Sequence, residues 1–156
     1  MGDEAHGLWM GTFHSIAVKI LRRYAERIGY GKDFVIYDSL DQKSIIRQCI
    51  KELGVNKEQF SVKIVTNKIS NAKNKMITPE NYRHIFPNDF TIANIYERYE
   101  EKMFKSNGMD FDNIIFNVNR LLKENQDVAD FYRQHFKYVL VDEYQDTNKA
   151  QYSMVN

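Results

Sequence analysis

The chain has 156 residues, of which 43% are apolar and 28% charged, and its formal net charge is +1. The apolar share is enough for the core of one domain and argues against intrinsic disorder. No apolar run approaches the roughly 18 residues of a transmembrane helix, and the start lacks a signal-peptide pattern. We therefore expect a cytoplasmic protein with no membrane partner. The single cysteine excludes an internal disulfide framework.

The near-neutral total hides an uneven distribution of charge. Residues 1–11 have a balance of −2, residues 12–75 hold thirteen Lys or Arg against six Asp or Glu, and residues 76–156 hold nine against thirteen. A basic first half attracts phosphate backbones, and an acidic second half can hold a cation. Variation between solvated helix faces would give the same division, and charge alone favours that explanation.

Helical periodicity covers most of the chain. Apolar spacing predicts helices over residues 12–28, 41–53, 57–75, 89–107, 111–122 and 127–135. Thr12 or Ser15 is expected to cap the first helix, and Gly29 to end it. Cys49 lies on an apolar stripe, which predicts a buried and inert thiol.

The end of the chain carries a different pattern. Residues 138–141, YVLV, form a short apolar run that stops abruptly at two acids. Such a run is typical of a strand buried on both faces of a parallel sheet. Residues 8–12 are a weaker strand candidate. We therefore expect a mainly α fold of five to six helices, with a short parallel strand pair formed by the two ends.

The acids that follow this strand suggest phosphoryl-transfer chemistry. Ligands of α/β nucleotide-binding sheets lie outside the carboxyl ends of strands. There Asp142 can hold Mg²⁺, Glu143 can orient an attacking water, and Gln145 can sense a γ-phosphate. An isolated Asp-Glu pair would favour a turn in which Asp146 caps a helix, but the whole octet VDEYQDTN after an apolar strand reverses that preference.

The octet resembles motif II, the Walker B motif, of superfamily 1A DNA helicases, the UvrD/PcrA/Rep family. Residues 11–15, GTFHS, resemble the single-strand-binding motif of this family, and stretches at 69–79 and 109–114 also match. In order and spacing, the resemblance covers essentially the whole chain.

The resemblance implies a fragment of an ATP-dependent 3′–5′ DNA helicase that unwinds duplex DNA in replication and repair, with Mg²⁺ and ATP as cofactors of the full-length parent. Residues 16–136 would be a helical, bundle-like 1B subdomain. Residues 1–15, with the TFHS motif, and residues 137–156, with Walker B, would be pieces of the truncated RecA-like α/β domain 1A. The implied partners are single-stranded DNA, the duplex junction and the remainder of the helicase (1A, 2A and 2B).

The resemblance also implies roles for single residues. Asp142 and Glu143 would lie at the metal, with Glu143 as the catalytic base, and Gln145 would contact the nucleotide as γ-phosphate sensor and coupling residue. By match to the single-strand-binding motif, the DNA contacts would be Thr12, Phe13 and His14.

Two alternatives for the basic first half stay open. Phe13 also fits the apolar stripe of its helix, so a core position competes with stacking on a base. The implied approach of 1B to DNA makes cations of this half candidate phosphate contacts, although lysines on helix surfaces are more often only solubilising. These cations are Arg22, Arg23, Arg27, Lys63, Lys68, Lys73 and Lys75.

The sequence also departs from a complete motor. It contains no G-x-x-x-x-G-K-[ST] stretch and no second RecA-like domain to donate an arginine finger. We therefore expect the fragment alone to hold neither Mg²⁺ nor ATP and to be inactive. The alternative is a free-standing helical interaction or DNA-binding module whose acidic ending is a capped turn. A metal-dependent nuclease is disfavoured, because the sequence has only one evident carboxylate cluster.

Overall fold

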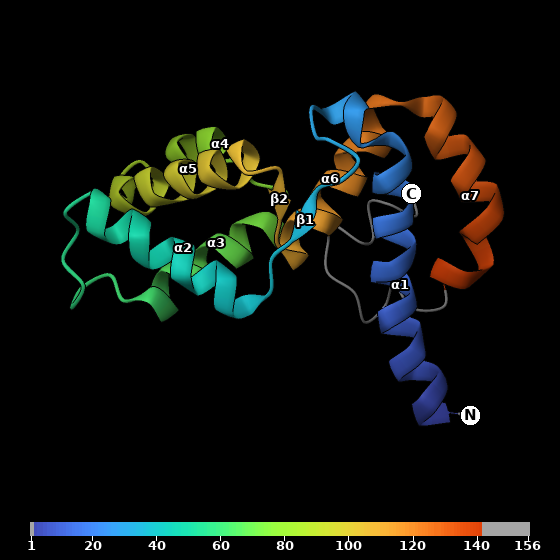
Figure 1. Cartoon of the computed structure of the whole chain (residues 1–156), viewed down its shortest axis with the longest axis horizontal. Coiled ribbons are helices and arrows are strands. Elements are labelled where there is room, and N and C mark those ends of the chain that lie inside the picture. The colour runs from blue at the N-terminus through green and yellow to red at the C-terminus, as the bar shows by residue number, and fades with distance from the viewer. Residues whose placement is uncertain (1, 142–156) are drawn as a thin grey trace. The chain divides into compact units, whose positions relative to one another are not determined.

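The computed structural model describes the backbone of residues 2–141 and the side chains of residues 13–134. This part of the chain contains seven α-helices, one 3-10 helix and two short strands, which confirms the mainly α fold. The chain divides into two compact units (Figure 1): unit 1 comprises residues 1–33 and 113–156, and unit 2 comprises residues 34–112. The domain boundaries predicted after residues 15 and 136 rest on motif positions and stay predictions.

Four helices build unit 2, three of them close to the predicted ranges and the fourth, over Pro79–Ile85, not predicted. They are α2 (Ser39–Glu52), α3 (Val62–Asn74), α4 (Pro79–Ile85) and α5 (Phe90–Lys105). α2 packs against both α3 and α5, and α4 packs against α5 (Figure 1). Buried side chains of all four helices, among them Ile46, Ile69, Tyr82 and Tyr96, form one core. The apolar spacing in the sequence therefore agrees with the inward faces of α2, α3 and α5.

Short polar side chains fix where these helices begin. The carboxylate of Asp38 accepts a hydrogen bond from the Asp41 backbone N–H, and the carboxylate of Asp41 accepts one from the Asp38 backbone N–H. The two bonds make a capping box at the start of α2. Ser61 accepts from the N–H of Ile64 at α3, and Thr78 caps α4. The starts expected at residues 41 and 57 therefore lie at 39 and 62.

Two strands join the ends of unit 2. β1 (Val35–Ile36) pairs in parallel with β2 (Gly108–Met109), with Val35 opposite Gly108. A Cβ at Gly108 would lie 2.2 Å from a ring carbon of Tyr37, so any larger residue would displace that ring. Glycine thus lets the aromatic ring pack directly on the strand backbone.

Unit 1 consists of helices from both ends of the chain. They are α1 (Gly2–Tyr24), the 3-10 helix η1 (Ala25–Ile28), α7 (Gln126–Val141) and most of α6 (Phe111–Glu124). Gly29 ends η1 with a φ of 85°, as predicted for a left-handed stop. Ile20 of α1 and Val118 of α6 are among the fully buried residues. None of the described helices is long and apolar enough to cross a membrane.

The expected strand pair at the chain ends is wrong. Residues 138–141 continue α7, and residues 8–12 lie inside α1. The described sheet has only β1 and β2, which pair with each other. A lone strand leaves its backbone N–H and C=O groups without partners, whereas a helix pairs them within the segment. Because α1 begins at Gly2, neither Thr12 nor Ser15 is its N-cap.

A buried ion-pair cluster lies inside unit 2. The Nζ of Lys73 is 2.9 Å from Oδ2 of Asp110 and also pairs with Glu100, and the Lys73 and Asp110 side chains are only 1% and 2% exposed. The same oxygen of Asp110 accepts hydrogen bonds from Tyr99 Oη at 2.6 Å and from Gln42 Nε2 at 3.4 Å. The cluster thereby joins α2, α3 and α5 to the residue between β2 and α6.

Opposing effects set the charge of Lys73. Burial by itself lowers the pKa of Lys73, but the charges of Asp110 and Glu100 outweigh burial and raise the pKa above its usual range. Burial and the neighbouring Asp110 likewise raise the pKa of Tyr99, which keeps its phenol protonated as a donor. The ammonium therefore stays charged, and its stabilising contribution is complete below the usual lysine pKa of 10.5 and is lost as the pH rises from there through the elevated pKa of the folded state.

Replacing Lys73 by methionine should strongly destabilise the protein. The substitution leaves the carboxylate of Asp110 buried without its cation, which costs about 3–5 kcal/mol in the free energy of unfolding. Urea denaturation followed by circular dichroism measures this loss. The matched control is Lys68→Met on the same helix, where a half-exposed ion pair with Asp89 is worth about 0–1 kcal/mol. Equal losses in the two variants would contradict the structural role of Lys73.

Cys49 should be inert in the folded protein. Its side chain is fully buried, and burial raises the pKa of the thiol from its usual 9.0 to about 11. We expect Ellman's reagent to react with Cys49 only after denaturation at pH 8. Because the folded pKa is the higher one, stability should hold below pH 9 and fall as the pH rises towards 11. Rapid reaction of the native thiol at pH 8 would refute this prediction.

Candidate nucleic-acid interface

The motif II acids, Asp142 and Glu143, and the neighbouring Gln145 lie outside the described residues, which end with α7 at Val141. Among the side chains that the structure describes, no three His, Cys, Asp or Glu residues are grouped to hold a metal ion. The metal and nucleotide roles of these three residues therefore rest on the sequence motif.

The single-strand-binding motif lies within α1. The backbone of Thr12 is helical, and its side chain is outside the described part. Phe13 is only 4% exposed, and its ring meets that of His14 edge-on with centroids 6.3 Å apart. Of the two alternatives left open for Phe13, this burial favours the core position in unit 1 over stacking on a base. His14 is partly exposed.

The cations at the end of α1 and in η1 make local contacts. Arg22 donates to a backbone carbonyl 2.9 Å away, and Arg27 pairs with Asp127 at 3.2 Å. The guanidinium groups of Arg23 and Arg27 lie 5.6 and 5.1 Å from the ring centroid of Tyr24. Arg23 is exposed and has no carboxylate partner among the described residues. Of these arginines, Arg23 is therefore the most accessible to a phosphate.

The four lysines expected on α3 fall into different environments. Lys63 and Lys75 are exposed, and Lys68 pairs with Asp89 at 3.1 Å while remaining half-exposed. Lys73 is buried, and its ammonium is already paired with two carboxylates. Lys73 is predicted to contact a DNA phosphate, but in this structure its ammonium is buried and holds two carboxylates inside unit 2.

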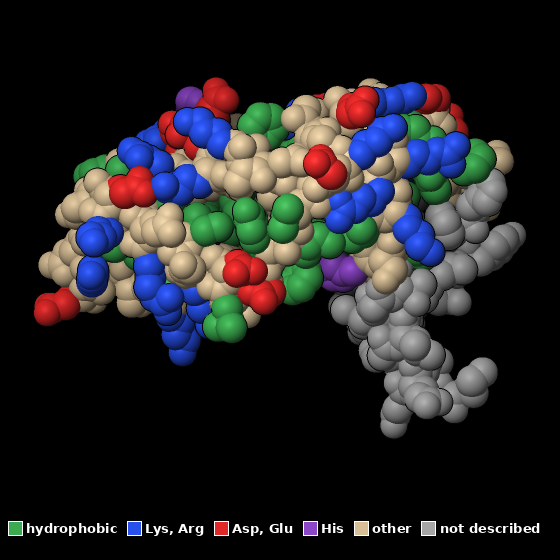
Figure 2. Space-filling view, viewed as in Figure 1, with side chains coloured by type: hydrophobic (Ala, Val, Ile, Leu, Met, Phe, Trp, Pro, Cys, Tyr) green, Lys and Arg blue, Asp and Glu red, His purple; other side chains and the backbone are tan. Residues whose placement is uncertain are grey.

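The predicted phosphate contacts do not include a row of cations on α2. Lys43, Arg47 and Lys51 recur at intervals of four residues, which places them along one side of the helix. Lys57 adds a further cation in the loop before α3. The four-residue spacing is the signal that identifies the row. Figure 2 shows Lys and Arg side chains on the visible surface of both units, interspersed with Asp and Glu rather than gathered in one patch.

Comparison with known proteins adds information beyond the geometry. A family model described as the UvrD/REP helicase N-terminal domain matches residues 1–156. An ATP-dependent DNA helicase PcrA from Staphylococcus epidermidis is 40% identical over 158 residues, which cover 99% of this chain and 22% of that protein.

Relatives from other organisms give the same result. The PcrA helicase of Leuconostoc citreum is 40% identical over 99% of this chain, and that of Staphylococcus aureus strain Mu50 is 38% identical over 99%. The matched segments are 21% and 22% of those two proteins. The chain thus spans about a fifth of the length of these curated relatives.

Proposed function

The chain belongs to the UvrD/REP helicase family, and we propose on that basis that it is a segment of an ATP-dependent 3′–5′ DNA helicase acting in replication and repair in the cytoplasm. The supporting observation is the family match along the entire chain, including both motif-bearing ends. In this proposal residues 16–136 are the 1B subdomain, and residues 1–15 and 137–156 belong to domain 1A. A free-standing helical module would not account for the match at both ends.

The motif II residues supply the ATPase chemistry in the proposed parent. Asp142 would hold Mg²⁺, which neutralises phosphate charge when bound, and Glu143 would take the proton of the attacking water. Gln145 would sense the γ-phosphate and couple hydrolysis to movement. Without a P-loop lysine and backbone amides around the phosphates, we expect the chain alone not to hydrolyse ATP.

The proposed DNA contacts in the parent come from both units. Thr12 and His14 would touch the single strand beside the buried Phe13 ring. The cations proposed to contact phosphates are Arg22, Arg23, Lys63 and Lys68. Arg23 and Lys63 are the strongest of these, because each is exposed and has no carboxylate partner among the described residues.

Replacing Glu143 by glutamine in the full-length parent should abolish most DNA-stimulated ATPase activity. Loss of a general base lowers kcat by roughly 10²- to 10⁴-fold. Phosphate release in the presence of single-stranded DNA measures the effect, and Glu80→Gln, a change at an exposed glutamate of α4, is the matched control. Retention of full activity by Glu143→Gln would remove this residue from the proposed role.

The chain should bind single-stranded DNA with a strong dependence on salt. Each neutralised phosphate adds roughly 0.7–0.9 to the slope of log affinity against log salt. The double variant Arg23→Glu/Lys63→Glu should weaken binding and flatten this slope, whereas Lys123→Glu on α6 should change little. Fluorescence anisotropy between about 50 and 200 mM salt measures both quantities. A salt-independent affinity, or no binding at all, would contradict the proposed contacts.

A further inference from the structure

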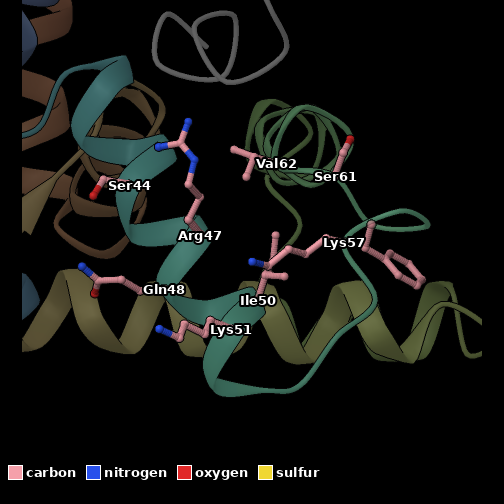
Figure 3. A pocket seen from close by; sticks show the side chains of 9 residues that line it. Ser44, Arg47, Gln48, Ile50, Lys51, Lys57, Ser61 and Val62 are labelled. Carbon is pink, nitrogen blue, oxygen red and sulfur yellow. The ribbon is translucent and has the colours of Figure 1, made fainter.

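A cavity of about 590 Å³ lies in unit 2 between α2, the loop before α3 and the first turn of α3. Its volume falls within the range of pockets that hold ligands. Figure 3 shows Arg47 extending from α2 to the side of Val62, and Lys57 reaching from the loop towards Ile50. Residues 44–62 thus form a concave site from one continuous stretch of chain.

In the described part of the chain, three cations around this cavity are not paired with carboxylates, unlike five other cations of unit 2. Arg47, Lys51 and Lys57 are exposed, and none of them has a carboxylate partner among the described residues. No described residue that lines the cavity is acidic. Elsewhere in the unit, carboxylates pair with Lys68, Lys73, Arg83, Arg98 and Lys102. The rim of the cavity therefore carries positive charge that the unit does not neutralise.

The floor of the cavity is apolar. Ile50 is buried, and Phe60 and Val62 are half-buried, so the accessible apolar surface of the floor comes mainly from Phe60 and Val62. Covering that surface with an apolar group is favourable. The first turn of α3 contains no acidic residue, and the N-terminus of this helix adds partial positive charge beside the same floor. A matching occupant needs both an apolar group and negative charge.

These features favour a peptide over a DNA duplex. A duplex presents phosphates on a convex surface and has no apolar side group to fill a pocket of this size. A single strand carries both bases and phosphates, so competition with oligothymidylate distinguishes it from a peptide. A protein segment combines a large apolar anchor with flanking carboxylates, and such anchors supply most of the binding energy at interfaces. The carboxylates of such a segment complement the positive rim of the cavity, and its apolar anchor fills the cavity itself.

We propose that this cavity is a docking site for an acidic peptide segment of a partner protein, with one large apolar side chain against Ile50, Phe60 and Val62. The flanking carboxylates of the segment face Arg47, Lys51 and Lys57. The ATPase and DNA-binding proposals name none of the residues that line this cavity, although the proposed phosphate contact Lys63 stands next to Val62 in the first turn of α3.

Fluorescence anisotropy with the whole chain tests the proposal. The probe is a short labelled peptide with a leucine-tryptophan-leucine centre flanked by glutamates. Two comparison peptides replace the glutamates by glutamine or the centre by alanine. Arg47→Glu/Lys57→Glu should weaken binding of the probe roughly tenfold. Lys105→Glu, an exposed change at the end of α5 away from the cavity, should leave the affinity unchanged. Circular dichroism confirms that each variant is folded.

Each outcome bears on the proposal. Weaker binding of both comparison peptides, together with loss in the double variant alone, supports it. Binding that survives Arg47→Glu/Lys57→Glu, or that Lys105→Glu weakens equally, would place the peptide elsewhere and overturn it. Failure of the probe to bind the unaltered chain overturns it as well. If oligothymidylate binds through Arg47 and Lys57 and displaces the peptide, the surface is a nucleic-acid contact and the proposal is wrong.

Discussion

The burial of one ammonium group constrains how unit 2 is assembled. Lys73 comes from the end of α3, Glu100 and Tyr99 come from α5, and Asp110 stands between β2 and α6. An isolated charge could not remain in this interior, because desolvation would cost far more than packing returns. The elements that bring the carboxylates and the phenol to the ammonium must therefore form together, and a lysine otherwise suited to DNA is withdrawn from the surface.

Most of the helices could be predicted from the sequence, but the strands could not. The apolar stripes of α2, α3 and α5 repeat over several turns, so the spacing of residues such as Ile46 and Ile69 shows which side of each helix faces the core. β1 and β2 have two residues each, too few to show any period. The run at 138–141 was misassigned because a short apolar stretch fits a buried strand and a buried helix segment equally well.

The candidate interface was only partly predictable for a related reason. Periodicity shows which side of a helix is apolar, but it does not reveal a cation that turns inward to meet carboxylates from distant segments, as Lys73 does. Nor does it show that Arg47 and Lys57, ten residues apart, meet around one cavity. The motif II acids could be proposed from the sequence because the match depends on a local string of residues rather than on tertiary packing.

The pairing of β1 with β2 has a consequence for how this protein can vary. Neighbouring strands lie about 4.8 Å apart, so Val35 near the start of unit 2 and Gly108 near its end lie side by side. When the two ends of a segment lie close together, the segment between them can lengthen, shorten or be exchanged. The distance between its two ends, to which the rest of the chain is joined, does not change. Evolution could therefore remodel residues 37–107 without altering the spacing of the flanking motifs.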